Sequence, residues 1–295
     1  DPALAAAGVP LGETMAEYAL CTATETCPLD AVQETWESRL EKVFPYRAVP
    51  DAETAAAPVP ALSFTAEAWP APALRTARPV AVIPMFPGTN CEVDTARALE
   101  RAGAEPRIVP VRNLTPAHVA RSVEEMAAAI RAAQMVVFPG GFSGGDEPDG
   151  SAKLIAAFFR NPAVREAAQA LLDGRDGLML GICNGFQALI KLGLLPFGRI
   201  TEPDAASPTL TFNTLGRHQS MLTRIRVAST RSSWLRRCRV GEIYTVPVSH
   251  GEGRFVCGAD TLNALAAAGQ IATQYVGPDG LPTMDLRYNP NGSVW

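Results

Sequence analysis

The chain has 295 residues, with 47% hydrophobic and 19% charged side chains and a net charge of −4. These values describe an ordinary globular protein of about two domains, and they exclude a disordered chain or a strongly basic nucleic-acid binder. No stretch approaches the ~18 consecutive apolar residues of a membrane span, and no signal peptide begins the sequence, so we expect neither a nucleic-acid nor a membrane partner. Because the chain begins at Asp1 and ends at Trp295 in a turn-like stretch, we expect both ends to be cut from a longer polypeptide.

Six cysteines are spread along the chain, at positions 21, 27, 91, 183, 238 and 257. None belongs to a C-x-x-C pair, and the three histidines, at 118, 218 and 250, complete no zinc-binding spacing. Without a secretory signal, such cysteines are typical of reduced thiols. We therefore expect a cytoplasmic protein without a metal site.

The first 78 residues predict two segments. Residues 1–43 are rich in helix formers, and Val32, Trp36 and Leu40 recur at helical spacing, so we expect a helical segment there. Between 44 and 79 the chain has seven prolines and many alanines, a composition that builds no regular core. We expect residues 44–78 to form a semi-rigid linker laid over a surface.

From residue 79 onward, short apolar runs alternate with helical segments. The runs are at 79–85, 107–111, 135–138 and 177–182, and the helical segments are at about 92–102, 115–132, 151–172 and 184–192. Strands buried on both faces read as continuous apolar runs, and their alternation with helices predicts an α/β fold with an open, mostly parallel sheet flanked by helices. After about residue 210 the runs at 222–227, 243–248, 255–257 and 271–276 predict an added antiparallel portion. We expect one domain over 79–295.

Cys183 lies at the end of the fourth predicted strand, directly before a helix. The surrounding segment, 181–185, reads Gly-Ile-Cys-Asn-Gly. Small residues two before and two after a nucleophile are what a sharp strand-to-helix elbow requires, and a helix N-terminus stabilises a thiolate. An inert buried cysteine is the alternative, but the flanking glycines favour a nucleophile.

A glycine-rich loop, Pro-Gly-Gly-Phe-Ser-Gly-Gly-Asp at 139–146, follows the third predicted strand. Such a loop lets backbone N–H groups approach a developing oxyanion, although a simple tight turn is an equal alternative for this motif alone. A phosphate loop is disfavoured because the Walker lysine is absent. Parallel strands end at one edge of the sheet, so the loop and Cys183 are expected to meet there, as acyl transfer through a thioester requires.

Residues 181–187, Gly-Ile-Cys-Asn-Gly-Phe-Gln, resemble the nucleophile motif of the class I glutamine amidotransferases. Three motifs, 86–91 (Phe-Pro-Gly-Thr-Asn-Cys), 140–146 and 249–254 (Ser-His-Gly-Glu-Gly-Arg), resemble more narrowly the glutaminase domain of phosphoribosylformylglycinamidine synthases, which act in purine biosynthesis. Residues 144–150 and 213–218 resemble the large single-chain form. Residues 29–48 resemble the tail of the synthetase portion that precedes the glutaminase in that form, which would make 1–43 the helical tail of a synthetase domain.

The resemblance implies a role for each matching residue. Cys183 would attack the side-chain amide of glutamine, and the backbone N–H groups of Gly141 or Phe142 and of Asn184 would form the oxyanion hole. The substrate would be held by further residues, namely Gly140, Gln187, Ser249, His250 and Gly251. The glutaminase domain would need no cofactor. Its ammonia would pass to the synthetase portion of the same polypeptide, a ligase that uses ATP and Mg²⁺ to convert formylglycinamide ribonucleotide to the amidine.

One part of the family pattern is missing. The family's triad adds a histidine and, two residues later, a glutamate near the C-terminus of the domain, and this motif would fall after Trp295. His250 and Glu252 have the same H-x-E spacing and are the alternative. We favour a pocket-forming role for His250, because the family places the base further downstream. His118 is expected to have no role, and the role of His218 stays open.

Six arginines gather between 224 and 239, at 224, 226, 231, 236, 237 and 239. They predict either a solvated basic face or an interface with an acidic partner surface. Two other functions also stay open beside the glutaminase. One is a stand-alone cysteine hydrolase of the same architecture, and the other is a non-catalytic scaffold that binds glutamine.

Overall fold

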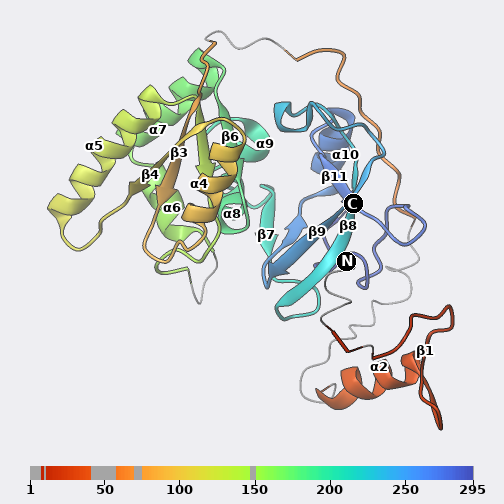
Figure 1. The fold of residues 1–295 in the computed structure, drawn as a ribbon. Coiled ribbons are helices and arrows are strands. Elements are labelled where there is room, and N and C mark those ends of the chain that lie inside the picture. The colour runs from red at the N-terminus through yellow and green to blue at the C-terminus, as the bar shows by residue number, and fades with distance from the viewer. Residues whose placement is uncertain (1–7, 10, 41–57, 70–74, 147–150, 295) are drawn as a thin grey trace. The chain divides into compact units, whose positions relative to one another are not determined.

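The structure is a computed structural model that describes residues 8–9, 11–40, 58–69, 75–146 and 151–294. The chain divides into two compact units, Asp1–Ala48 and Val49–Trp295. The second unit contains a parallel sheet and an antiparallel portion (Figure 1). No helix among the described residues is long and apolar enough to cross a membrane.

The first unit is a small hairpin followed by a helix. Strands β1 (Ala19–Cys21) and β2 (Thr26–Pro28) pair antiparallel, and helix α2 (Leu29–Glu37) continues into the 3-10 turn η1 (Ser38–Leu40). The prediction of a helix throughout 1–43 is therefore wrong for 19–28. The hydroxyl of Thr22 accepts a hydrogen bond from the backbone N–H of Glu25 at 3.0 Å, which closes a turn there. Residues 1–7, 10 and 41–43 lie outside the described residues.

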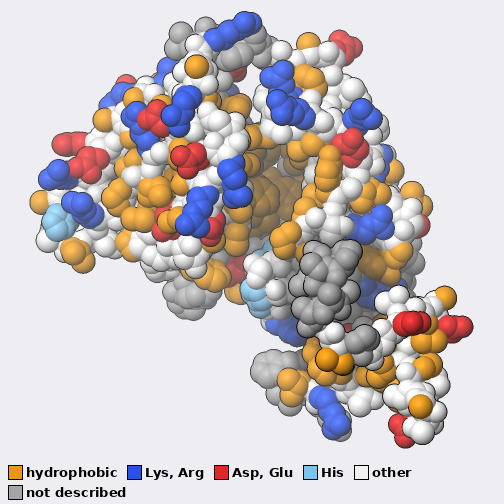
Figure 2. All heavy atoms as spheres, in the orientation of Figure 1, with side chains coloured by type: hydrophobic (Ala, Val, Ile, Leu, Met, Phe, Trp, Pro, Cys, Tyr) orange, Lys and Arg blue, Asp and Glu red, His pale blue; other side chains and the backbone are white. Residues whose placement is uncertain are grey.

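Helix α2 buries none of its residues within its own unit. Trp36 is 79% exposed, and Val32 and Leu40 on the same predicted stripe are also exposed. Figure 2 shows hydrophobic side chains over this unit. The predicted amphipathic pattern is thus present, but its apolar face is not covered by the described part of the unit.

Four strands form the parallel sheet of the second unit. They are β3 (Val80–Met85), β4 (Glu105–Pro110), β5 (Met135–Phe138) and β6 (Leu178–Gly181), in the order β4-β3-β5-β6. Every neighbouring pair is parallel. Residues such as Val82 and Val136 have no exposed surface, which explains why the strands read as unbroken apolar runs. The predicted parallel sheet is confirmed.

Helices connect these strands and supply most of the core. They are α4 (Glu92–Arg101), α5 (Pro116–Ala132), α6 (Lys153–Phe159), α7 (Pro162–Gln169) with a π-helical turn η2 (Ala170–Gly174), α8 (Asn184–Lys191) and the short α9 (Leu194–Phe197). Helix α5 begins where Thr115 accepts a hydrogen bond from the N–H of His118 and Pro116 takes the first helical position. In Figure 1, α5 and α7 lie side by side, and their buried faces join the core that covers the sheet.

The predicted antiparallel portion follows residue 207. Strands β8 (Gln219–Val227), β9 (Ile243–His250) and β11 (Thr273–Tyr275) form a sheet in the order β11-β8-β9, and β7 (Thr209–Thr211) pairs with β10 (Arg254–Val256). The 3-10 turn η3 (Ser233–Leu235) joins β8 to β9. Helix α10 (Ala259–Ala267) was not expected, and its Leu262 and Leu265 are buried.

Residues 58–69, the longer of the two described stretches of the predicted linker, lie along this antiparallel sheet. The side chain of Gln274, which is 1% exposed, accepts from the N–H of Leu62 at 2.9 Å and donates to the carbonyl of Pro60 at 3.0 Å. Phe64 bridges Ser229 in parallel register. The proline-rich stretch therefore obtains its backbone partners from the sheet beneath it.

Three of the six arginines between 224 and 239 donate to backbone carbonyls of the second unit. Arg224 donates to the carbonyls of Gly277 and Pro278, and Arg226 donates to the carbonyl of Leu62 at 2.7 Å. Arg231 donates to another backbone carbonyl, that of Ala268. These three side chains join strands and loops, and the two alternatives for the cluster stay predictions.

Candidate active site

Cys183 occupies a sharp turn between β6 and α8. Its backbone has φ 53° and ψ −113°, a left-handed conformation that non-glycine residues rarely adopt. Such strain persists only where the surrounding structure imposes it, and it is common at functional sites. The thiol is exposed and directly precedes the N-terminus of α8. The predicted elbow is present.

The two glycines that flank the elbow are required by close backbone contacts. A Cβ added at Gly181 would overlap the carbonyl of Gly185, and a Cβ added at Gly185 would overlap the carbonyl of Phe138, the last residue of β5. Both neighbours are backbone atoms and have little freedom to move. The prediction that small residues are needed two before and two after Cys183 is therefore confirmed.

The glycine-rich loop lies against Cys183, as predicted. A Cβ added at Gly140 would be 3.2 Å from the Cβ of Cys183. Gly141 has φ +94°, so the loop turns in a conformation that suits glycine. The N–H of Gly144 donates to the carbonyl of Pro87 at 2.7 Å, which ties the loop to the segment after β3. Phe142 is 57% exposed, so the loop borders an accessible site.

Two residues on α8 connect the elbow to other segments. Asn184 is buried, and its side-chain Nδ2 donates to the carbonyl of Gly141 at 2.8 Å. Gln187, one turn further on, donates through Nε2 to the backbone carbonyl of Glu252 at 2.8 Å. The structure thus gathers Cys183, the glycine loop and α8 at one edge of the sheet. Glu252 links α8 to the segment that follows β9.

The segment 249–252 is held by a polar network at the end of β9. Asn213 donates through Nδ2 to the carbonyl of His250 at 2.9 Å, and its N–H donates to the carbonyl of Gly251 at 2.9 Å. The hydroxyl of Ser249 lies 3.0 Å from the Nε2 of His218, which places this histidine beside the segment. Ser249, His250 and Gly251 are therefore joined to the elbow through their neighbour Glu252.

His250 and Glu252 do not form a histidine–carboxylate pair. The Nε2 of His250 lies 3.2 Å from the Nδ2 of Asn291, and Oε2 of Glu252 accepts from the hydroxyl of Ser151. The other atom of each group, Nδ1 of His250 and Oε1 of Glu252, is buried without a hydrogen-bond partner among the described residues. Burial lowers the pKa of His250, and the charge of His218 lowers it further. A lowered pKa favours the neutral imidazole, which is compatible with the predicted pocket-forming role of His250.

Cys91 also lies beside Cys183, which the sequence did not reveal. The same added Cβ at Gly140 that would approach Cys183 would lie 3.7 Å from the Sγ of Cys91. Burial raises the pKa of the Cys91 thiol, and the charge of Cys183 raises it further. Cys91 therefore favours the thiol form and is a natural internal control for reagents that select a thiolate.

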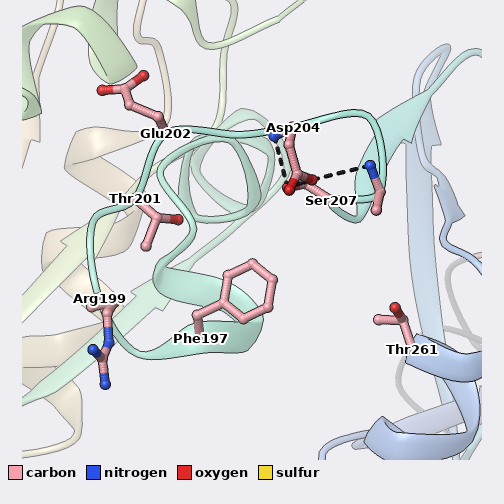
Figure 3. Close-up of a pocket in the computed structure, with 8 residues that line it drawn as sticks. Phe197, Arg199, Thr201, Glu202, Asp204, Ser207 and Thr261 are labelled. Carbon is pink, nitrogen blue, oxygen red and sulfur yellow. Dashed lines mark hydrogen bonds between the residues drawn. The ribbon is translucent and has the colours of Figure 1, made fainter.

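A separate cavity of about 540 Å³ lies between the loop after α9 and helix α10 (Figure 3). Phe197, Arg199 and Thr261 line it, and Asp204 accepts from the hydroxyl of Ser207 at 2.8 Å on its wall. None of the predicted site residues lines this cavity, so it does not hold the predicted chemistry. No group of three or more possible metal ligands occurs among the residues that the structure describes.

Sequence reasoning missed two buried polar residues near the elbow, Asp146 and Ser151. Both are 2% exposed. A signal for Asp146 was available, because a serine followed three residues later by an acidic residue has the spacing of a capping box, in which the acidic side chain accepts from the backbone N–H of the serine. Ser151 gave no such signal, since its partner Glu252 is 101 residues away.

An open parallel sheet flanked by helices, with a strained cysteine elbow facing a glycine loop, defines the chain as an α/β protein with the layout that acyl transfer through a cysteine requires. Residues 78–295 match the sequence model of the CobB/CobQ-like glutamine amidotransferase domain. The chain belongs to this family.

Curated relatives agree with this assignment. The chain is 36% identical over 213 residues to phosphoribosylformylglycinamidine synthase subunit PurQ of Symbiobacterium thermophilum, covering 71% of this chain and 76% of that protein. It is 34% identical over 230 residues to the PurQ subunit of Treponema denticola, covering 74% and 80%. The structure of PurLQS from Thermotoga maritima has 28% identity and a TM-score of 0.45, covering 62% of this chain and 71% of that one.

Proposed function

We propose that this chain is the glutaminase portion of phosphoribosylformylglycinamidine synthase, in its large single-chain form. The observation that carries the proposal is the elbow, in which exposed Cys183 faces the glycine loop at 140–145. The relatives named above are PurQ subunits of that synthase, and at 36% identity they support the same role here. The motifs at 144–150 and 213–218 support the single-chain form.

In the proposed reaction the Cys183 thiolate attacks the side-chain carbonyl carbon of glutamine. The carbonyl oxygen becomes an oxyanion, which accepts hydrogen bonds from the backbone N–H of Asn184 and of Gly141 or Phe142. The N–H of Asn184 belongs to the first turn of α8 and has no partner within the helix. Collapse of this intermediate releases ammonia and leaves a glutamyl thioester on Cys183. Water then attacks the thioester carbonyl, and glutamate leaves as the thiolate re-forms.

The remaining predicted residues hold the substrate in this proposal. Gly140 leaves room beside Cys183, while Gln187 and the 249–251 segment form the wall against the amino-acid end of glutamine. The leaving ammonia needs a proton from a positioned acid. His250 is not assigned this role, because its Nε2 faces Asn291 and it is not paired with Glu252. The proposal assigns the role to a histidine and a glutamate downstream of the residues described.

The proposed partner is the synthetase portion, which would use ATP and Mg²⁺ and receive the ammonia. Helix α2 and the turn η1 after it support this part of the proposal, because Trp36 and Leu40 expose apolar surface that the described residues of their unit leave uncovered. Large exposed apolar surface marks interaction sites. Residues 29–48 resemble the tail of the synthetase, so the face of α2 is assigned to packing against that portion.

A glutamine-like chloroketone tests the proposed nucleophile. We expect peptide mapping after brief exposure to find the reagent on Cys183, and excess glutamine to prevent this labelling. Cys91 is the internal control, because it lies beside Cys183 but has a raised pKa. Iodoacetamide, which has no amino-acid group, is the matched reagent: it should also reach exposed cysteines outside the site, and glutamine should protect only Cys183 from it, because the bound substrate covers that thiol. Equal chloroketone labelling of Cys91 or Cys238 would remove the basis for the assignment.

A further inference from the structure

The glycine loop ends in a buried carboxylate that accepts hydrogen bonds from three segments. Asp146 accepts from the N–H of Ser143 at 2.6 Å and from its hydroxyl at 2.8 Å, and from the N–H of Lys153 at 2.9 Å. It also accepts from Nδ2 of Asn184 at 3.1 Å. An ionised carboxylate only accepts hydrogen bonds, and each of these four contacts is a donor. Asp146 therefore connects the loop to α6 and α8.

Asn184 is the connection that reaches the nucleophile. It directly follows Cys183, is 1% exposed, and its Nδ2 donates to both the carbonyl of Gly141 and the carboxylate of Asp146. Because both acceptors are oxygens, the amide has one favourable orientation, and a flipped amide would turn its own oxygen toward them. Asp146 thus fixes which way the Asn184 side chain points. The side chain in turn sets the spacing between the glycine loop and the elbow.

We propose that Asp146 is a positioning residue for glutamine hydrolysis, acting through the Asn184 side chain to hold the two sides of the oxyanion hole at their working distance. The inference rests on the proposed function, which puts one oxyanion donor on Asn184 and the other on Gly141 or Phe142. The oxyanion exists only after the thiolate has attacked. Loss of the alignment should therefore slow the chemical step more than it weakens glutamine binding.

Asp146→Asn in the complete enzyme is the main test. In either orientation the new NH₂ group would meet a donor: in the place of Oδ2 it would face the N–H of Ser143 and the NH₂ of Asn184, and in the place of Oδ1 it would face the N–H of Lys153. We expect the kcat of glutamine hydrolysis to fall ~10²-fold, the size of effect seen when an oxyanion donor is lost, with little change in KM. An aldehyde analogue of glutamine, whose adduct with Cys183 carries an oxygen in the oxyanion position, should bind more weakly by about the factor lost from kcat/KM. Alkylation by iodoacetamide should be unchanged.

Two variants separate positioning from general support of the loop. Ser143→Ala removes the hydroxyl contacts to Asp146 but keeps the contact between Asp146 and Asn184, so it should leave kcat nearly intact. Asn184→Ala removes the contact between Asp146 and the Asn184 side chain. It should therefore lower kcat and weaken binding of the aldehyde analogue as much as Asp146→Asn does. This second variant keeps the test available if Asp146→Asn does not fold.

The inference is overturned if Asp146→Asn or Asn184→Ala keeps wild-type kcat. It is also overturned if kcat, KM and the rate of iodoacetamide alkylation all change together, because this would indicate a general distortion of the site. A kcat of Ser143→Ala as low as that of Asp146→Asn would overturn it as well. Failure of the proposed function gives a different result. In that case the wild-type enzyme would not release ammonia from glutamine, or Cys183 would not be its nucleophile.

Discussion

Cys183→Ala in the complete enzyme is expected to abolish glutamine-dependent synthesis, by on the order of 10⁴-fold or more, because no other group replaces the covalent step. Synthesis from added ammonium should continue, since the proposed synthetase reaction uses a separate site. Alanine keeps the Cβ, so the strained backbone at φ 53° is no more unfavourable than before and the variant should fold. Steady-state rates with glutamine and with ammonium, measured side by side, give the comparison.

Cys238→Ala is the matched control, because Cys238 is also a free cysteine but lies on a half-buried turn outside the predicted site. It should keep both rates. If Cys183→Ala still hydrolysed glutamine at a substantial rate, or lost ammonium-dependent synthesis to the same extent, the assignment of the nucleophile or of two separate sites would be wrong.

Gly185→Ala is expected to have the second-largest effect, on stability and activity together. The new Cβ would overlap the carbonyl of Phe138, so β5 and the elbow must separate. Overpacking of this kind costs roughly 1–3 kcal/mol of unfolding free energy, and here the displaced atoms carry the nucleophile. We expect a lower denaturant midpoint and a large loss of glutaminase rate in whatever fraction folds.

Gly174→Ala supplies the control for this substitution. Nothing lies within 4 Å of an added Cβ at Gly174, and its φ is not positive, so the same chemical change meets no neighbour. It should leave stability and rate near those of the wild type. Equal behaviour of the two variants would show that the contact between Gly185 and Phe138 does not constrain the elbow.

The parallel sheet and the elbow were predictable for local reasons. Strands such as 135–138 are buried on both faces, so their apolar character is continuous in the sequence. The glycines around Cys183 reflect contacts made within a few residues or at the end of the neighbouring strand. Both features can therefore be predicted from the residue types at the positions involved.

Contacts between residues that are far apart in the sequence could not be predicted in this way. The spacing of His250 and Glu252 suggested a catalytic base with its carboxylate partner. In the structure His250 contacts Asn291 and Glu252 contacts Ser151, which are 41 and 101 residues away. Arg226 belonged to an apparent basic cluster, yet it donates to a carbonyl 164 residues away. Spacing and charge alone do not reveal which distant atom a side chain meets.

A single-turnover experiment with isotopically labelled glutamine tests the central claim most directly. The complete enzyme is mixed with the labelled substrate, quenched in acid within one turnover and digested. We predict that the label appears as a glutamyl thioester on the peptide that contains Cys183, that hydroxylamine removes it, and that it disappears after longer incubation as glutamate is released. Labelled glutamate formed without any covalent adduct on this peptide, or an adduct on the peptide of Cys91, would contradict the account.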